Sequence, residues 1–238
     1  LCNQRCTHCG IHTVNKKIKE FSTEEWLEII NALCYMGTEW FRFLGGEPLL
    51  RKDIKQLIDY VAVKKGKIAE IITNGVGIEK KMDDLKNLQF VGISIEGNKE
   101  NHERVRGPGS FEKALRAIEA CVAADKYVRL HMVLNKYNMQ DENIDFMIRL
   151  CKKYCVQFDF CRLMDNPYLG SSGIPDYYYI SDRDTRNFYK TMLKRKIEEN
   201  IPISNSVRSL QLLIDWPFSY DKYTLYKNEL KALSNYSL

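Results

Sequence analysis

The sequence predicts an α/β fold in which parallel strands alternate with helices, and three observations support this. Short apolar runs of strand length alternate with stretches of helical periodicity between residues 22 and 163. Glycine, asparagine or other polar residues follow the apolar runs, as at a strand-to-helix turn. At 238 residues, 45% hydrophobic and 28% charged, the chain has the size and composition of one large globular domain. Strands that alternate with helices imply right-handed strand–helix–strand crossovers and therefore a parallel sheet.

The expected elements follow one another regularly. Ser22 to Glu25 form a capping box that begins a helix, and Gly37 ends it. Downstream, we expect strand 40–44, helix 54–63, strand 68–72, a short polar helix near 80–88, strand 90–95, a helix capped by Ser110 that runs to about Ala124, strand 128–134, helix 142–155 and strand 156–163.

The pattern changes after Met164. Residues 165–180 are rich in Gly, Pro, Ser and Tyr and precede a helix capped by Ser181, with more helix expected toward the end of the chain. We therefore expect a core, residues 1–164, and a helical extension, residues 165–238, that packs on it and is not an independent domain.

Polar and glycine residues gather after four expected strands. They are Gly45-Gly46-Glu47-Pro48, Thr73-Asn74-Gly75, Ser94-Ile95-Glu96-Gly97 and Leu163. In parallel α/β folds, functional groups lie at the carboxyl ends of the strands. Turn formation alone is an alternative for Thr73-Asn74-Gly75, but it does not explain the paired glycines with a glutamate.

Three cysteines, Cys2, Cys6 and Cys9, lie in the opening segment LCNQRCTHCG. Thiolates bind soft metals and iron–sulfur clusters, and three of them on a four-iron cluster leave one iron open to an exchangeable ligand. The alternative is a zinc-binding structural or interaction module that adds His8 or His12 to the three thiols. Zinc, however, needs neither of the glycine- and glutamate-containing motifs.

The other cysteines are interpreted as small apolar residues. Cys34 and Cys121 lie among apolar helix positions, and Cys151, Cys155 and Cys161 are more typical of buried core than of auxiliary cluster ligands.

Composition also excludes some function classes. The net charge of +5 comes from 36 basic and 31 acidic residues spread along the chain without a nucleic-acid reading motif, so no nucleic-acid partner is expected. No segment is long and apolar enough to span a bilayer, and no signal peptide is visible, so we expect a cytoplasmic protein without a membrane partner. In that compartment cysteines favour metal binding over disulfides.

The three motifs, in this order, resemble those of the radical S-adenosylmethionine (radical SAM) superfamily. The resemblance implies a partial (βα)6 TIM-like barrel with a 4Fe-4S cluster on Cys2, Cys6 and Cys9. It also implies an enzyme that reductively cleaves S-adenosylmethionine to a 5′-deoxyadenosyl radical, which abstracts hydrogen from a substrate. An electron donor such as flavodoxin or ferredoxin follows from this chemistry, which the cofactors supply.

The resemblance further implies which residues contact S-adenosylmethionine. His8 and Leu163 would lie against the adenine, and Ser94 and Glu96 would contact the ribose and methionine. Arg106 would pair with the methionine carboxylate through a bidentate contact. The full set is His8, Gly45, Gly46, Glu47, Pro48, Thr73, Asn74, Ser94, Glu96, Arg106 and Leu163, with Glu47 and the glycines accepting from the methionine ammonium.

The sequence differs from the family motifs at two points and resembles one branch of the family more closely than the others. Glu96 stands where Asp is more frequent, and the strand expected before Cys2 is missing, so the N-terminus looks trimmed. Residues 92–111 resemble the branch that modifies peptides or proteins and often carries a cysteine-rich SPASM or twitch extension, so the resemblance implies a peptide or protein substrate. No cysteine follows Cys161, however. Glycyl-radical activating enzymes and small-molecule radical enzymes remain alternatives, and the sequence identifies no catalytic acid, base or radical donor.

Overall fold

The computed structural model describes residues 1–12, 19–163, 178–222 and 229. Within these residues five strands form one parallel sheet in the order β1-β2-β3-β4-β5. This sequential order confirms the expected α/β fold. The strands are β1 (Trp40–Phe43), β2 (Ile68–Thr73), β3 (Phe90–Ser94), β4 (Tyr127–Leu134) and β5 (Gln157–Arg162).

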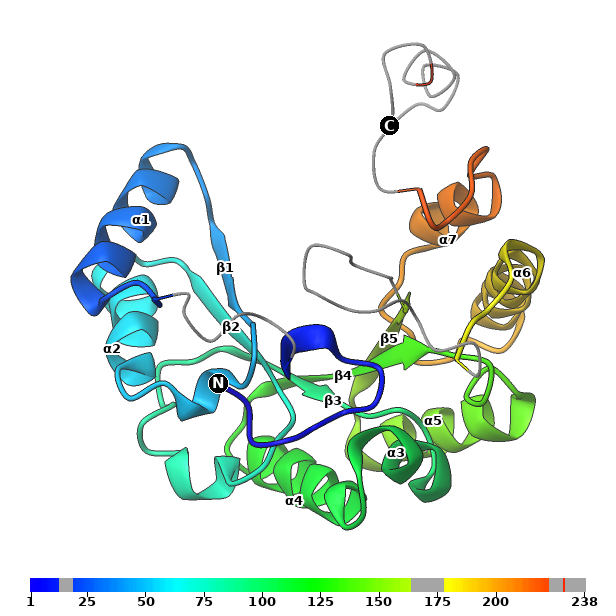
Figure 1. Cartoon of the computed structure of the whole chain (residues 1–238), viewed down its shortest axis with the longest axis horizontal. Helices are drawn as coiled ribbons and strands as arrows, with labels where there is room; N and C mark the ends of the chain where they lie inside the picture. The colour runs from blue at the N-terminus through cyan, green and yellow to red at the C-terminus, as the bar shows by residue number, and fades with distance from the viewer. Residues whose placement is uncertain (13–18, 164–177, 223–228, 230–238) are drawn as a thin grey trace.

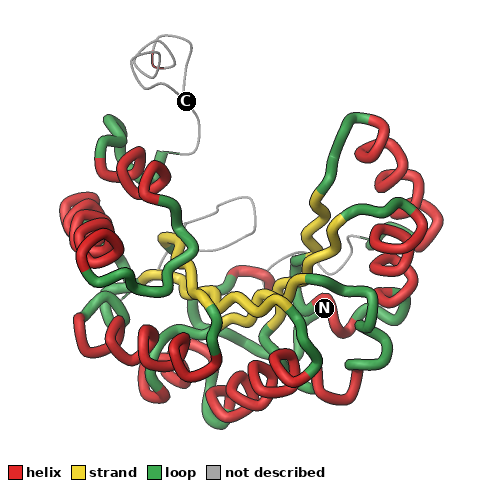
Figure 2. Tube along the Cα trace, turned by 180° about the vertical axis from the view of Figure 1, so that it is seen from behind, coloured by secondary structure: helices red, strands yellow, loops and turns green. Residues whose placement is uncertain are grey.

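The sheet is curved, and the helices lie on its convex side (Figure 1). The opening segment of the chain crosses the concave side, and the view from behind shows the same open arch (Figure 2). The helices that cover the convex face are α1 (Thr23–Tyr35), α2 (Ile54–Asp59), α3 (Lys99–Arg106), α4 (Ser110–Ala123) and α5 (Asp141–Tyr154).

Alternation along each strand separates the two faces of the sheet. Ile71, Ile93 and Leu130 are each 0% exposed and belong to the main hydrophobic cluster under the helices. Because successive strand side chains point to opposite faces, the residues between them face the concave side. The sheet thus has an apolar, helix-covered face and a second face beneath the opening segment.

Helix α1 begins as the sequence predicts. The Ser22 side chain accepts a hydrogen bond from the Glu25 amide at 3.2 Å, and the Glu25 carboxylate accepts one from the Ser22 amide at 2.6 Å. This reciprocal capping box satisfies two amides that would otherwise lack helical partners. Gly37 follows the helix at φ 91°, where a side chain would be strained.

Several helix boundaries differ from the expectation. The helix expected at 54–63 continues beyond α2 as a π-helical turn, Tyr60–Lys64, and that expected at 80–88 is a short 3₁₀ turn, Ile78–Lys81. Ser110 is the first residue of α4 and not its cap, because its hydroxyl donates to the Gly107 carbonyl at 2.6 Å.

Helix α3 was not expected from the sequence. It begins after Asn98, whose side chain accepts a hydrogen bond from the Asn101 amide at 3.0 Å. Asparagine is among the preferred N-cap residues, so this cap is the sequence signal for the helix.

The extension packs against β5. Ser181 caps α6 (Asp182–Glu198) as predicted, accepting from the Asp184 amide at 3.1 Å, and α7 (Val207–Ile214) follows. The Phe158 amide donates a hydrogen bond to the Pro202 carbonyl at 3.0 Å, and the Phe158 carbonyl accepts one from the Ser204 amide at 2.8 Å. Residues 202–204 therefore run beside the strand. In the described part of the chain, no helix has both the length and the apolar character needed to cross a bilayer.

Candidate active site

The cysteine-bearing segment, residues 1–12, is anchored to three parts of the sheet edge. The Thr7 amide donates to the Val105 carbonyl at 2.9 Å, and the Glu47 amide donates to the Leu1 carbonyl at 2.8 Å. The Asn74 side chain donates to Asn3 at 2.7 Å. These contacts hold the segment over the carboxyl ends of β1, β2 and β3, where the sequence predicts the site.

Three free thiols, of Cys2, Cys6 and Cys9, come from this one segment. Burial raises the pKa of the Cys6 thiol to about 11, the nearby Arg106 charge lowers it, and Cys9, Glu96 and Cys2 raise it further. The thiols are therefore close enough to influence one another. Among the described residues, no three of His, Cys, Asp or Glu are arranged as they would be around a metal ion. As a donor set, three unpaired thiols in one loop nevertheless fit an iron–sulfur cluster.

Glu47 joins the loop after β1 to the end of β2. One carboxylate oxygen accepts from the Thr73 hydroxyl at 2.7 Å and the Leu49 amide at 3.1 Å, and the other accepts from the Asn74 amide at 2.9 Å. Burial raises the pKa of Glu47, while these three hydrogen bonds and the Arg106 charge oppose the rise. Pro48, also buried, begins a 3₁₀ turn that follows.

The two glycines before Glu47 meet different constraints. A Cβ on Gly46 would lie 2.0 Å from the Leu1 carbonyl oxygen, so only glycine allows this close approach. Gly45 has φ 145° and open space around it, so its requirement is conformational.

Glu96 and Arg106 form a buried ion pair, 0% and 9% exposed. Burial would raise the pKa of Glu96, but the Arg106 charge, the His8 charge and hydrogen bonds from Arg106 and the Val133 amide hold it below its usual value. Burial and the Arg106 charge lower the pKa of His8, and Glu96 opposes this. These residues therefore share one site. With its side chain 9% exposed, Arg106 is not a solvated surface charge.

The Arg106 guanidinium also reaches the cysteine segment. Its remaining terminal nitrogen lies 4.0 Å from the Cys6 sulfur. A single cation thus lies between the thiols and the Glu96 carboxylate.

Sequence reasoning missed a set of buried polar residues behind this pair. His102 is 1% exposed, and its Nδ1 accepts a hydrogen bond from the Glu96 amide at 3.2 Å. Burial lowers the pKa of His102 to about 4. Asn138 donates to the Val133 carbonyl at 2.9 Å, and Asn143 donates to the Asn138 carbonyl at 2.9 Å. Polar residues at buried positions of α3 and α5 are the signal that could have found His102 and Asn143, whereas Asn138 lies in the turn between β4 and α5.

Leu163 and Ser94 lie at the ends of their strands as expected. Leu163 is 8% exposed and packs with Val105 and Tyr178, and Cys6 contacts the same cluster. Ser94, half-buried, stands opposite His131 on β4. Of the three tyrosines 177–179, Tyr177 lies outside the described residues.

The interpretation of Cys155 and Cys161 as buried apolar residues is wrong, because both are exposed. Cys155 follows α5 at φ 54°, and Cys161 lies on the concave side of β5. Cys121 and Cys151 are buried as expected, and Cys34 is half-buried.

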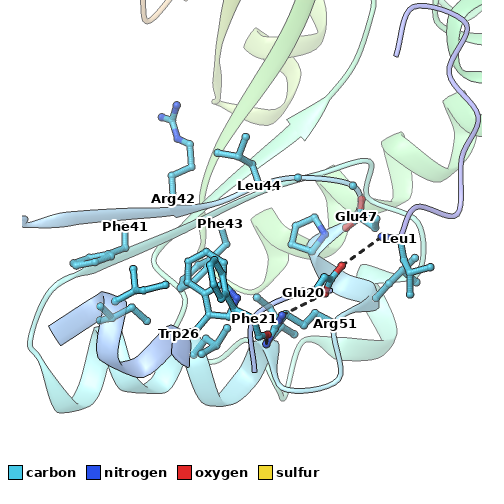
Figure 3. A pocket seen from close by; sticks show the side chains of 18 of the residues that line it. Leu1, Glu20, Phe21, Trp26, Phe41, Arg42, Phe43, Leu44, Glu47 and Arg51 are labelled. Atoms are coloured by element: carbon cyan, nitrogen blue, oxygen red, sulfur yellow. Dashed lines mark hydrogen bonds and ion pairs between the residues drawn. The ribbon is translucent and has the colours of Figure 1, made fainter. Parts of the chain in front are cut away.

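A separate cavity of about 660 Å³ lies beside β1. It is lined mainly by apolar side chains of β1, α1 and α2, and Figure 3 shows Glu20 bridging Leu1 and Arg51 at its rim. It shares only residues 45–48 and Leu1 with the surroundings of the thiols.

Comparison with known sequences identifies the same superfamily that the sequence motifs resemble. The family model of the radical SAM superfamily matches residues 1–148. The chain is 38% identical over 145 residues to Fe-coproporphyrin III synthase of Methanosarcina barkeri, across 59% of this chain and 36% of that protein. It is 32% identical over 174 residues to GTP 3′,8-cyclase of Clostridium botulinum, across 68% and 53%. The chain thus spans about half, or less, of the length of these relatives.

Solved structures share the fold. SuiB of Streptococcus suis bound to S-adenosylmethionine has a TM-score of 0.71 at 16% identity, covering 85% of this chain and 47% of that one. The protein anSMEcpe with bound AdoMet has a TM-score of 0.67 at 21% identity, covering 85% and 60%. At such identities the likeness establishes the architecture alone.

Proposed function

Because the chain belongs to the radical SAM superfamily, we propose that this enzyme cleaves S-adenosylmethionine reductively and directs the resulting radical to a small-molecule substrate. The observation that carries the proposal is the position of Arg106, between the Cys6 thiol and the buried Glu96 carboxylate. Such a buried cation beside three thiols provides a site for an anionic group next to a cluster.

Cys2, Cys6 and Cys9 would hold a 4Fe-4S cluster. When bound, the cluster supplies the electron that breaks the sulfonium bond, and an electron donor such as flavodoxin or ferredoxin replenishes it. Burial raises the pKa of Cys6, and the Arg106 charge opposes this rise and so favours the thiolate form that ligation requires.

The remaining residues would hold S-adenosylmethionine. Arg106 already donates Nε and one terminal nitrogen to Glu96, so its other terminal nitrogen is the one available to a methionine carboxylate. The contact would be single and not the bidentate one that the resemblance suggests. Glu47 is held by three protein donors, so Gly45 and Gly46 carbonyls would be the main acceptors for the ammonium.

His8 and Leu163 would contact the adenine. Burial lowers the pKa of His8 and so favours its neutral form, while Glu96 opposes this shift. A neutral imidazole can stack on a base without adding a buried charge. Ser94 would face the ribose from the end of β3.

The small-molecule assignment rests on the sequence relatives. One is named as a synthase of Fe-coproporphyrin III and the other as a cyclase of GTP. The expectation of a peptide or protein substrate has no support among them.

Anaerobic reconstitution with iron and sulfide tests the proposal. Wild-type protein should bind about four iron atoms, and adding S-adenosylmethionine should change the paramagnetic signal of the reduced cluster. Cys155→Ser is the matched control because that thiol is exposed and lies outside the segment. Tight binding of one zinc and no iron would instead support the structural module.

A further inference from the structure

The concave face of the sheet carries two kinds of side chain in ordered rows. Phe90 stands opposite Tyr127 in the register, and their rings stack 4.9 Å apart with Trp40 adding a third ring at 4.4 Å from Phe90. Two residues farther along β4 from Tyr127, the face becomes polar, with Arg129 and then His131.

Arg129 is the least satisfied of these polar groups. Its side chain is 27% exposed, and its one ion pair joins a terminal nitrogen to Asp159 at 3.8 Å, beyond hydrogen-bond distance. Among the described residues no hydrogen bond from its guanidinium is found. Asp159 instead accepts a hydrogen bond from His131 Nδ1. Most N–H donors of the Arg129 guanidinium, referred to below as its fork, are therefore available to a ligand.

The neighbourhood keeps this fork accessible. Gly92 stands opposite Arg129 in the register, so no side chain from β3 competes for it. The His131 ring fills the space over Gly92, where a Cβ would come within 2.4 Å of Nε2. Arg129 thus lies among the His131 imidazole, the aromatic row, the Asp159 carboxylate and a strand position without a side chain.

We propose that Arg129 binds an anionic group, carboxylate or phosphate, of a flat conjugated substrate that lies on the concave face. Charge complementarity carries this, because a partly buried guanidinium without hydrogen bonds favours a bidentate oxyanion. The aromatic row provides the stacking surface for the conjugated part. This inference deepens the proposed function and rests on it for the word substrate.

The strand geometry gives the backbone separation between Arg129 and the proposed radical site. Val133, four residues after Arg129 on β4, donates its amide to Glu96. At a rise of about 3.3 Å per residue, the two backbone positions are roughly 13 Å apart. A substrate held at Arg129 must therefore extend about that distance to reach the Glu96–Arg106 site.

Calorimetric titration of two probes tests the inference. Trimesate, a flat aromatic tricarboxylate, and inorganic tripolyphosphate would be titrated separately into the purified protein. The wild type should bind at least one of them, and the preferred probe identifies the class of anion. Arg129→Gln should weaken that binding roughly tenfold to a hundredfold, because a charge-assisted contact is lost.

Two further variants sharpen the result. Asp159→Asn should bind the probe more tightly than wild type, because the competing carboxylate 3.8 Å from Arg129 loses its charge. Arg149→Gln is the matched control, since Arg149 is an exposed residue of α5 on the convex side. Absence of binding by wild type, or affinity within about twofold of wild type in Arg129→Gln, would overturn the inference.

The titration requires no S-adenosylmethionine cleavage. Cleavage without probe binding would refute the substrate class alone, and Arg129-dependent binding without cleavage would refute the proposed function alone.

Discussion

Glu96 accepts two hydrogen bonds from Arg106 on a single carboxylate oxygen, from Nε at 2.9 Å and from a terminal nitrogen at 2.6 Å. The other oxygen accepts the Val133 amide at 2.9 Å. One side chain therefore connects the end of β3 to α3 and β4, and it does so with its charge fully compensated.

Replacing Glu96 by Gln should destabilise the apoprotein strongly. The amide leaves the buried Arg106 charge without its partner, which costs about 3–5 kcal/mol of unfolding free energy. Urea denaturation measures this. Glu112→Gln, which removes an exposed partner of Lys99, should change the midpoint little. Equal midpoints for the two variants would contradict the buried pair.

The contribution of Glu96 should also depend on pH. The folded-state pKa of Glu96 is lowered, so its stabilisation is fully present above the ordinary value of 4.5 and is lost as the pH falls through the folded pKa. The difference in unfolding free energy between wild type and Glu96→Gln should stay constant from pH 7 to about 5 and shrink below that. A difference that grows on acidification would contradict this sign.

Glu47→Gln tests the link between β1 and β2. The amide nitrogen would face a backbone donor, Asn74 N–H, so one hydrogen bond is lost and two donors are opposed. We expect a loss of about 1–3 kcal/mol in denaturation experiments. Glu79→Gln, at an exposed position, provides the control. An unchanged midpoint for Glu47→Gln would show that the carboxylate is not held as described.

Tyr178→Phe should loosen the cysteine segment. The Tyr178 hydroxyl is hydrogen-bonded to the Thr7 hydroxyl, and Thr7 lies next to Cys6. Loss of about 1 kcal/mol in local stability should raise the alkylation rate of Cys6 in the apoprotein about fivefold. Mass spectrometry of the labelled peptide measures the rate. Tyr179 is 47% exposed, and the Tyr179→Phe variant should leave the rate near that of wild type. Equal rates in both variants would show that the Thr7–Tyr178 hydrogen bond does not hold the cysteine segment in place.

The sequence predicts the strands and the functional residues at their ends better than the contacts that join these residues. The strands and the residues at their carboxyl ends follow from local patterns. Glu47, Asn74 and Glu96 could therefore be predicted as residues of one site. The Thr7–Tyr178 bond joins residues 171 positions apart, and no local pattern encodes such a contact. Cys161 is a different case, because the period of two already places it on the same strand face as Gln157 and Asp159 and could have predicted its exposure.

The polar residues of the concave face could be predicted from the sequence only in part. Arg129 and His131 alternate with buried apolar residues of β4, so the period of two places them on one face. Their shared partner, Asp159, lies on another strand and depends on the register. The sequence alone therefore indicates which residues face inward but not which of them meet.

The most direct test of the central claim is production of 5′-deoxyadenosine by the reduced, reconstituted protein given S-adenosylmethionine, measured by chromatography and mass spectrometry. We predict slow formation by wild type and by Cys155→Ser, and none by Cys6→Ala, because Cys6 would be a cluster ligand and Cys155 would not. Wild-type-like formation in Cys6→Ala, or no formation by wild-type protein that carries its iron and sulfide, would contradict it.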